Sequence, residues 1–166
     1  MIRAFSYTLL SLLLAGATAC HEVESTPQTD FFVQATRNTA PWTAPGTGTY
    51  SQASQQFYIF GQTGDAAKAE ALSLGFALPA APQLASVQAL PAAWRVSVGF
   101  DALIDSYATA DGTGLPRVEI TRLDTVNKLV EGRFEATLVR EKQWTSKVET
   151  MTLEKGAFRV HYTEVP

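Results

Sequence analysis

The chain has almost no cysteine, since Cys20 is the only one among its 166 residues. A single cysteine cannot form an intramolecular disulfide, and it excludes a zinc site built from several thiolates. The folded part must therefore be stabilised by its hydrophobic core alone. Residues 21–166 are numerous enough for one domain, which would bury roughly two thirds of the surface that the unfolded chain exposes.

Basic residues are few and scattered. The 13 lysines and arginines are outnumbered by 16 aspartates and glutamates, which gives a formal net charge of −3, and no basic cluster is visible. Proteins that bind nucleic acids concentrate basic residues on one surface, where they displace the counterions of the phosphates. The sequence therefore predicts no nucleic-acid partner.

Motifs of the common enzyme classes are missing as well. The chain contains no G-x-S-x-G, no G-x-x-x-x-G-K-[ST], no H-E-x-x-H, and no G-x-G-x-x-G between a strand and a helix. Of its two histidines, His21 precedes the predicted domain, so only His161 remains for a Ser-His-Asp site. His161 alternates with Val160 and Tyr162, which is typical of an exposed strand position. We predict neither a metal nor a cofactor, because His161 has no partners at ligand spacing.

The N-terminal residues have the parts of an export signal. Arg3 provides a positive charge, residues 7–14 (YTLLSLLL) are apolar, and residues 15–19 are small. An apolar run of roughly ten residues is about half of what a bilayer-spanning helix requires. We therefore predict that residues 1–19 are a cleaved signal peptide.

Cys20 follows this segment directly. The residues Ala17-Thr18-Ala19-Cys20 resemble the lipobox of bacterial lipoproteins, although Ala17 stands where that family most often has leucine. The resemblance implies that the Cys20 thiol is lipidated and becomes the first mature residue. Two or more acyl chains hold a protein stably on a membrane. The alternative is ordinary cleavage after Ala19, which would leave a free thiol.

Polar residues separate Cys20 from the first apolar pattern. Residues 21–30 (HEVESTPQTD) include Pro27 and have no apolar period, which predicts a flexible tether. Glu22 and Glu24 also resemble an acidic signal that sends some lipoproteins to the outer face of the outer membrane, although a solvated linker is the simpler explanation. We expect a protein of the bacterial cell envelope, anchored at the outer membrane, with residues 20–30 as anchor and tether and 31–166 as one domain.

The domain has the two-residue apolar period of β-strands. Such a period buries one face of a sheet and leaves the other in water. Residues 65–71 and 82–91 could each hold a turn or two of helix, but they do not alternate with strands as a parallel βαβ fold requires. The sequence predicts an all-β antiparallel sandwich or partly closed barrel of about nine strands. The predicted strands are Phe31–Thr36, Gln55–Gly61, Leu72–Leu78, Trp94–Phe100, Leu103–Ala108, Arg117–Leu123, Leu129–Arg140, Lys147–Leu153 and Ala157–Thr163.

Three polar segments predict the connections between strands. Asp111–Gly114 and Glu154–Gly156 provide glycines where a hairpin requires a positive φ, and Asp124–Lys128 joins two alternating strands. On the strand that follows, one face is apolar, and Gly132 leaves room there for a large neighbour.

Five segments of the domain resemble a group of uncharacterised bacterial lipoproteins. Their pattern has an I-T-x-x-D strand, a turn, an x-x-G-x-F strand and a terminal G-x-F-x-V-x-Y strand, and the resemblance spans residues 31–163. It implies the all-β fold and the lipoprotein class, but no known activity or catalytic residue. The segments are Asn38–Ala44, Val118–Asp124, Asn127, Val130–Phe134 and Gly156–Tyr162.

Two pairs of carboxylates leave an enzymatic alternative open. Asp101 and Asp105 are four residues apart, and Glu131 and Glu135 project from the same face of a strand. Glycosidases place two carboxylates across a sugar, so the alternative is a carbohydrate-active hydrolase with an unrecognised site. Arg133 lies between the two glutamates, which favours a solvated face instead.

Aromatic residues suggest the function that we prefer. Trp42, Trp144 and Tyr50 are predicted to lie in or beside loops, where exposed rings could stack on sugars or anchor a protein partner. The alternative is that Trp42 and Trp144 cap the ends of the core. Trp94, by contrast, belongs to an alternating strand and is predicted to be core. We expect a noncatalytic domain that binds an envelope protein or a polysaccharide.

Overall fold

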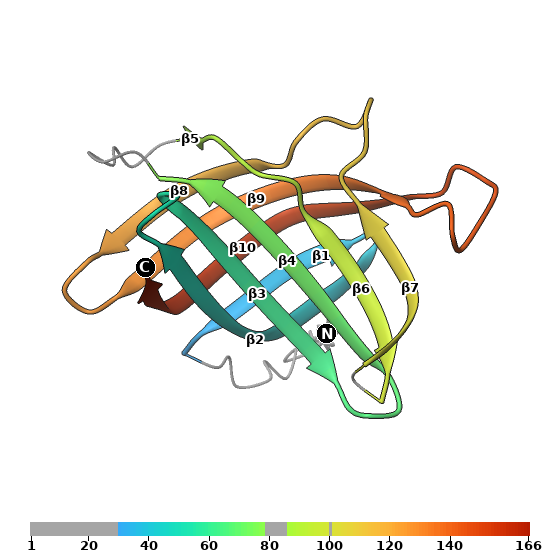
Figure 1. Cartoon of the computed structure of the whole chain (residues 1–166), viewed down its shortest axis with the longest axis horizontal. Coiled ribbons are helices and arrows are strands. Elements are labelled where there is room, and N and C mark those ends of the chain that lie inside the picture. The colour runs from blue at the N-terminus through green and yellow to red at the C-terminus, as the bar shows by residue number, and fades with distance from the viewer. Residues whose placement is uncertain (1–29, 79–85, 100) are drawn as a thin grey trace, which may run out of the picture.

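The computed structural model describes residues 30–78, 86–99 and 101–166, and this part of the chain is entirely β-structure and connections (Figure 1). The predicted all-β class is confirmed, with ten strands instead of about nine. The predicted signal peptide, Cys20 and most of the predicted tether lie outside the described residues. The strands are β1 Phe32–Arg37, β2 Ala40–Ser51, β3 Gln56–Gly64, β4 Ala69–Ala77, β5 Ser86–Val87, β6 Ala93–Val98, β7 Ala102–Ala108, β8 Arg117–Asp124, β9 Leu129–Arg140 and β10 Thr150–Val165.

All ten strands belong to one sheet whose hydrogen bonds close into a ring. β10 pairs with β9 along one edge, and along the other edge with β1 and then with the end of β2. β2, β3, β4, β6 and β7 follow in order, and β7 returns to β9 through two residue pairs. In Figure 1, β3 and β4 cross in front of β9 and β10. The arrangement is a partly closed barrel with two layers.

The interior of the ring is a continuous aromatic and aliphatic core. The Phe57 ring stacks on Phe76 with centroids 5.3 Å apart, and Phe76 lies 6.0 Å from Phe158. Trp94, which the sequence predicts to be core, is fully buried and meets Trp42 edge to face at 4.7 Å. Such contacts contribute about 0.5–1.5 kcal/mol beyond the area that they bury. These rings therefore join the front layer to the back layer.

A glycine on β9, Gly132, lets the Phe158 ring pack directly against the backbone inside this core. A Cβ on Gly132 would lie 2.5 Å from the Phe158 ring and 2.5 Å from the carbonyl oxygen of Glu119. The room that the sequence predicts at Gly132 is therefore occupied by Phe158.

The turn expected at Glu154–Gly156 is wrong. The structure has one long strand, β10, in which Glu154 and Lys155 form a bulge opposite Glu135 of β9. Lys155 takes the positive φ of 51°, and the chain continues in the same direction. A bulge adds one residue to a strand without reversing it, and its local sequence resembles that of a turn. The two strands expected at 147–153 and 157–163 are consequently one.

Strand β2 was not expected, because Pro41 and Pro45 interrupt residues 40–51. Both prolines are exposed and oppose Thr36 and Phe32 of β1. The tight turn between β1 and β2 forms without glycine, since Asn38 adopts a φ of 55°. Asparagine tolerates this conformation better than most residues do.

The helical turns that residues 65–71 and 82–91 could hold do not form within the described residues. Strand β4 begins at Ala69, and β5 spans Ser86–Val87. Residues 79–85 lie outside the described part of the chain. Ala89 then bridges to Phe76 of β4, so this connection extends the sheet.

The turn expected at Asp124–Lys128 is confirmed. Asp124 Oδ1 accepts hydrogen bonds from the backbone N–H groups of Asn127 at 2.9 Å and Val126 at 3.1 Å. Lys128 has a φ of 53° and begins the return into β9. The Asn127 backbone and side-chain N–H groups, which stabilise the carboxylate, lower the pKa of Asp124.

This lowered pKa predicts a pH-dependent loss of stability in Asp124→Ala. A carboxylate with a depressed folded pKa stabilises the protein above its ordinary pKa of about 3.9, and the contribution is lost as the pH falls through the folded value. The variant should melt below wild type at pH 7, and the difference should shrink in thermal scans at progressively lower pH. Asp111→Ala, which removes an exposed aspartate without such hydrogen bonds, is the control. A difference in melting temperature that is independent of pH would contradict this account.

Candidate functional site

The outward side chains of β2, β3 and β4 form a surface without charge, which we call the neutral face. Inward residues of these strands fill the core, so the alternate positions point to solvent. All three strands lie within the described residues, and none of their outward side chains is ionisable apart from the weakly acidic tyrosine. The neutral face consists of Thr43, Pro45, Thr47, Thr49, Tyr58, Phe60, Gln62, Ala71 and Ser73.

Two aromatic side chains lie at the centre of the neutral face. Tyr58 and Phe60 are 44% and 43% exposed, and they are separated by one residue on β3. Thr49 lies opposite Tyr58 on β2, and Thr47 lies opposite Phe60. Hydroxyl groups therefore flank the two rings on the β2 side.

On the β4 side, Gly75 lies opposite Tyr58 and leaves a space that Leu90 fills. A Cβ on Gly75 would lie 3.1 Å from Leu90 Cδ1. The Tyr58 hydroxyl donates a hydrogen bond of 2.6 Å to Gln56 Oε1, which fixes the outer end of the ring. The result is an apolar strip with ordered polar groups at its margin.

The opposite layer presents a very different surface. We call the outward side chains of β8, β9 and β10 the charged face, because acidic and basic residues alternate across it. Its members are Arg117, Glu119, Arg122, Glu131, Arg133, Glu135, Glu154, Lys155, Arg159 and His161.

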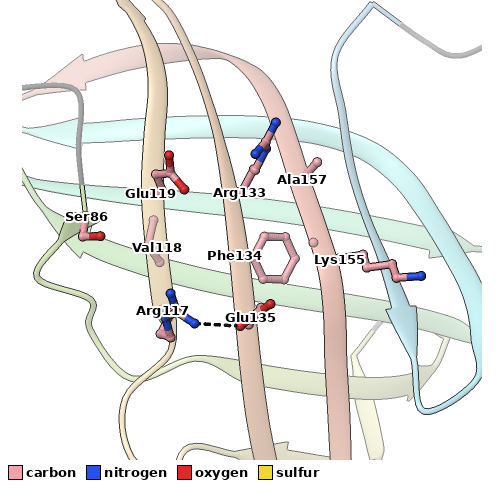
Figure 2. A pocket seen from close by; sticks show the side chains of 10 residues that line it. Ser86, Arg117, Val118, Glu119, Arg133, Phe134, Glu135, Lys155 and Ala157 are labelled. Atoms are coloured by element: carbon pink, nitrogen blue, oxygen red, sulfur yellow. Dashed lines mark hydrogen bonds and ion pairs between the residues drawn. The ribbon is translucent and has the colours of Figure 1, made fainter.

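The carboxylate pair Glu131 and Glu135 is engaged with arginines on this face. Glu131 Oε1 lies 3.4 Å from Arg122 Nη1 and 3.5 Å from Arg159 Nε. Glu135 Oε2 lies 3.3 Å from Arg117 Nη1 (Figure 2). Both carboxylates are therefore engaged with arginines, whereas a glycosidase needs two carboxylates that are free to reach a bound sugar. These contacts favour the solvated face that the sequence also suggested.

The second carboxylate pair has unequal surroundings. Asp105 Oδ1 accepts a 2.8 Å hydrogen bond from Arg140 Nε, whereas exposed Asp101 has no hydrogen bond or ion pair among the described residues.

His161 is exposed on β10, as its alternation predicts, and its ring lies 6.1 Å from that of Phe31. No group of three or more metal-ligating side chains occurs in the described part of the chain.

The position expected for Trp42 in or beside a loop is wrong, whereas Tyr50 lies next to the last residue of β2, beside the turn over residues 52–55. Both lie in β2, and Trp42 is 7% exposed against Trp94. Half-buried Tyr50 packs against Phe57 with ring centroids 4.7 Å apart. Two prolines in residues 40–51 make β2 hard to predict from the sequence. The inward rings of β2 pack in the core because burying them removes apolar area from water.

Trp144 lies in a loop, as expected, but its indole is occupied. Trp144 Nε1 donates a 2.7 Å hydrogen bond to Oγ of Ser106, a buried residue of β7. The Ser106 hydroxyl in turn donates to Glu141, whose backbone N–H bonds the Ser106 carbonyl at 2.9 Å. Trp144 is thus half-buried and fastens the β9–β10 connection to β7.

Among the described residues, Tyr58 and Phe60 have the most exposed aromatic side chains, and the sequence pattern does not single them out. Every residue from Phe57 to Phe60 is apolar or aromatic, so the two-residue period does not distinguish the inward set from the outward set. The signal that could have found them is the polarity of the partner strand, where threonines occupy positions 43, 47 and 49.

Comparison of the chain with protein-family models, with curated proteins and with solved structures finds no match. Among the described residues, no helix is long and apolar enough to cross a membrane.

The Trp144 contact predicts a measurable role for Ser106. Ser106→Ala should lower the free energy of unfolding by about 1–3 kcal/mol, because the Trp144 indole and Glu141 both lose a partner. Urea denaturation measures the stability, and the fluorescence maximum should move to longer wavelength as Trp144 becomes more exposed. Ser97→Ala, which removes a hydroxyl without a hydrogen bond in the described structure, is the matched control. Unchanged stability and fluorescence in Ser106→Ala would contradict this role.

Proposed function

We propose that this chain is a lipid-anchored protein of the bacterial cell envelope whose β domain binds a neutral polysaccharide without catalysing a reaction. The observation that carries the binding proposal is the neutral face with Tyr58 and Phe60 at its centre. The anchoring proposal depends on the lipobox-like residues that end at Cys20 and on the resemblance to bacterial lipoproteins.

The neutral face has the chemistry that a neutral sugar requires. Sugar rings have apolar C–H surfaces that stack on aromatic rings, and their hydroxyls exchange hydrogen bonds with threonine, serine and glutamine. Tyr58 and Phe60 offer the first contact, and the hydroxyls of Thr47, Thr49 and Ser73 lie beside them. Because these strands expose no charge on this face, binding requires no ion to be desolvated.

The preference for binding over hydrolysis comes from the carboxylates. Glu131 and Glu135 are each paired with arginine on the charged face, and Asp105 is paired with Arg140. The neutral face has no carboxylate that could act as an acid or a nucleophile on a sugar bound there.

Alanine substitutions test the neutral face. Tyr58→Ala and Phe60→Ala should each weaken binding to a neutral polysaccharide by up to about tenfold, since a stacked ring contributes roughly 0.5–1.5 kcal/mol. The measurement is affinity electrophoresis of the purified chain in gels containing neutral glucans, mannans or galactans. Val126→Ala, which alters an 86% exposed side chain in the β8–β9 turn, should bind as wild type does. Failure to bind any of these glycans would reject the binding proposal.

Substitution of Cys20 tests the anchor. In a bacterial host that processes lipoproteins, the full-length chain should incorporate labelled fatty acid and partition into the detergent phase. Cys20→Ser should do neither, because the serine hydroxyl does not replace the thiol as the acyl acceptor. Release of the unchanged chain as an unlabelled, detergent-independent protein would reject the lipoprotein assignment and would leave the binding proposal standing.

A further inference from the structure

A shallow groove of about 410 Å³ crosses β8, β9 and β10 on the charged face (Figure 2). Arg133 and Glu119 line it from β9 and β8, and Lys155 and Ala157 line it from β10. Figure 2 shows Arg133 and Ala157 side by side on neighbouring strands. The groove is independent of the neutral face, which belongs to the other layer.

Charges alternate across the strands of this face, with one gap. Arg117 lies opposite Glu135, and Glu131 lies opposite Arg159. Pairs of opposite charge on facing strand positions stabilise a sheet. The residue of β10 that lies opposite Arg133, however, is Ala157. The alternation of charges predicts an acidic residue at that position.

Cations surround this alanine. Lys155 and Arg159 lie two residues to either side of it on the same face of β10, and Arg133 lies opposite it on β9. On the remaining side, Gln34 of β1 lies opposite Ala157 and can donate from its amide. By register, residues with donor groups on three strands are therefore neighbours of Ala157, and Arg133 and Lys155 are the cationic ones among them that line the groove.

Two of the three cations are unpaired. Within the described residues, neither Arg133 nor Lys155 makes an ion pair, whereas Arg117, Arg122 and Arg159 each do. The bulge contributes to this arrangement, because it places Lys155 outward beside Glu154 and keeps Gly156 inward.

We infer that the groove binds the carboxylate of an acidic sugar, with the oxyanion above Ala157 beside Arg133 and Lys155, the two cations of the groove that make no ion pair among the described residues. Arginine binds carboxylates through two parallel hydrogen bonds, which gives both strength and orientation. The Glu119 carboxylate at the other side of Arg133 accepts hydrogen bonds from the sugar hydroxyls. A continuous anionic surface fits less well, because it would also meet Glu119, Glu135 and the other carboxylates of this face.

The ligand class is tested with a galacturonic acid tetrasaccharide and its methyl ester. Calorimetric titration of the full-length chain in a polyoxyethylene detergent should show binding of the acid, an affinity that falls as salt is added, and no binding of the ester. Inorganic phosphate and glycerophosphate, the water-soluble headgroup chemistry of anionic phospholipids, are the other probes. Tighter binding of either than of the acid would overturn the assignment to a sugar.

Substitutions in the groove test where the carboxylate of the ligand lies. Ala157→Glu places a carboxylate where the ligand's should lie, and it should weaken binding of the tetrasaccharide at least about tenfold. The melting temperature should stay equal or rise, because the introduced carboxylate would face Arg133 across the strands. Arg133→Gln should weaken binding by about the same factor.

Arg95→Gln is the matched control, since Arg95 is an exposed arginine without an ion pair on β6, in the other layer. It should bind as wild type does. Wild-type affinity in both Ala157→Glu and Arg133→Gln, or equal affinity for the acid and its ester, would overturn the proposal.

Discussion

The burial of one alternate set of side chains inside a closed sheet is the constraint on which the rest of this structure depends. Every strand that joins the ring must turn apolar residues inward, and the rings of Phe57, Phe76 and Phe158 connect the two layers across the interior. Large inward rings require glycine at the points of closest approach, as Gly132 beneath Phe158 illustrates. At the margin of this core, Arg37 lies 4.8 Å above the Trp94 ring and bonds Glu70 at 2.6 Å.

Because the inward positions are committed to the core, the outward positions are free to differ between layers. β2, β3 and β4 expose threonine, proline and two aromatic rings, whereas β8, β9 and β10 expose alternating charges. Cross-strand ion pairs such as Arg117 with Glu135 are exposed, and pairs of this kind contribute little to stability. The two faces therefore differ in what they can recognise, while the same core supports both.

The sequence predicted strands well where inward and outward residues differ in polarity. Residues 129–140 alternate clearly, and β9 occupies that range without change. The prediction was wrong where one local sequence is compatible with two different backbone structures. Glu154–Gly156 resembles a turn but forms a bulge, and residues 40–51 contain two prolines but form a strand at whose exposed positions those prolines lie. Proline is tolerated in a strand where its missing N–H leaves no ladder bond unmade.

The sequence by itself determined the all-β class and the position of the one cysteine, because two-residue periodicity and composition are local properties. Only the tertiary structure decided which aromatic rings are exposed. Trp42 and Tyr58 both lie on strands, but closure of the ring turns the first toward Trp94 and the second toward solvent. It also decided that Ala157 is surrounded by cations, since Arg133 and Lys155 become neighbours through the register of β9 with β10. Register depends on the packing of the whole core, which no single segment encodes.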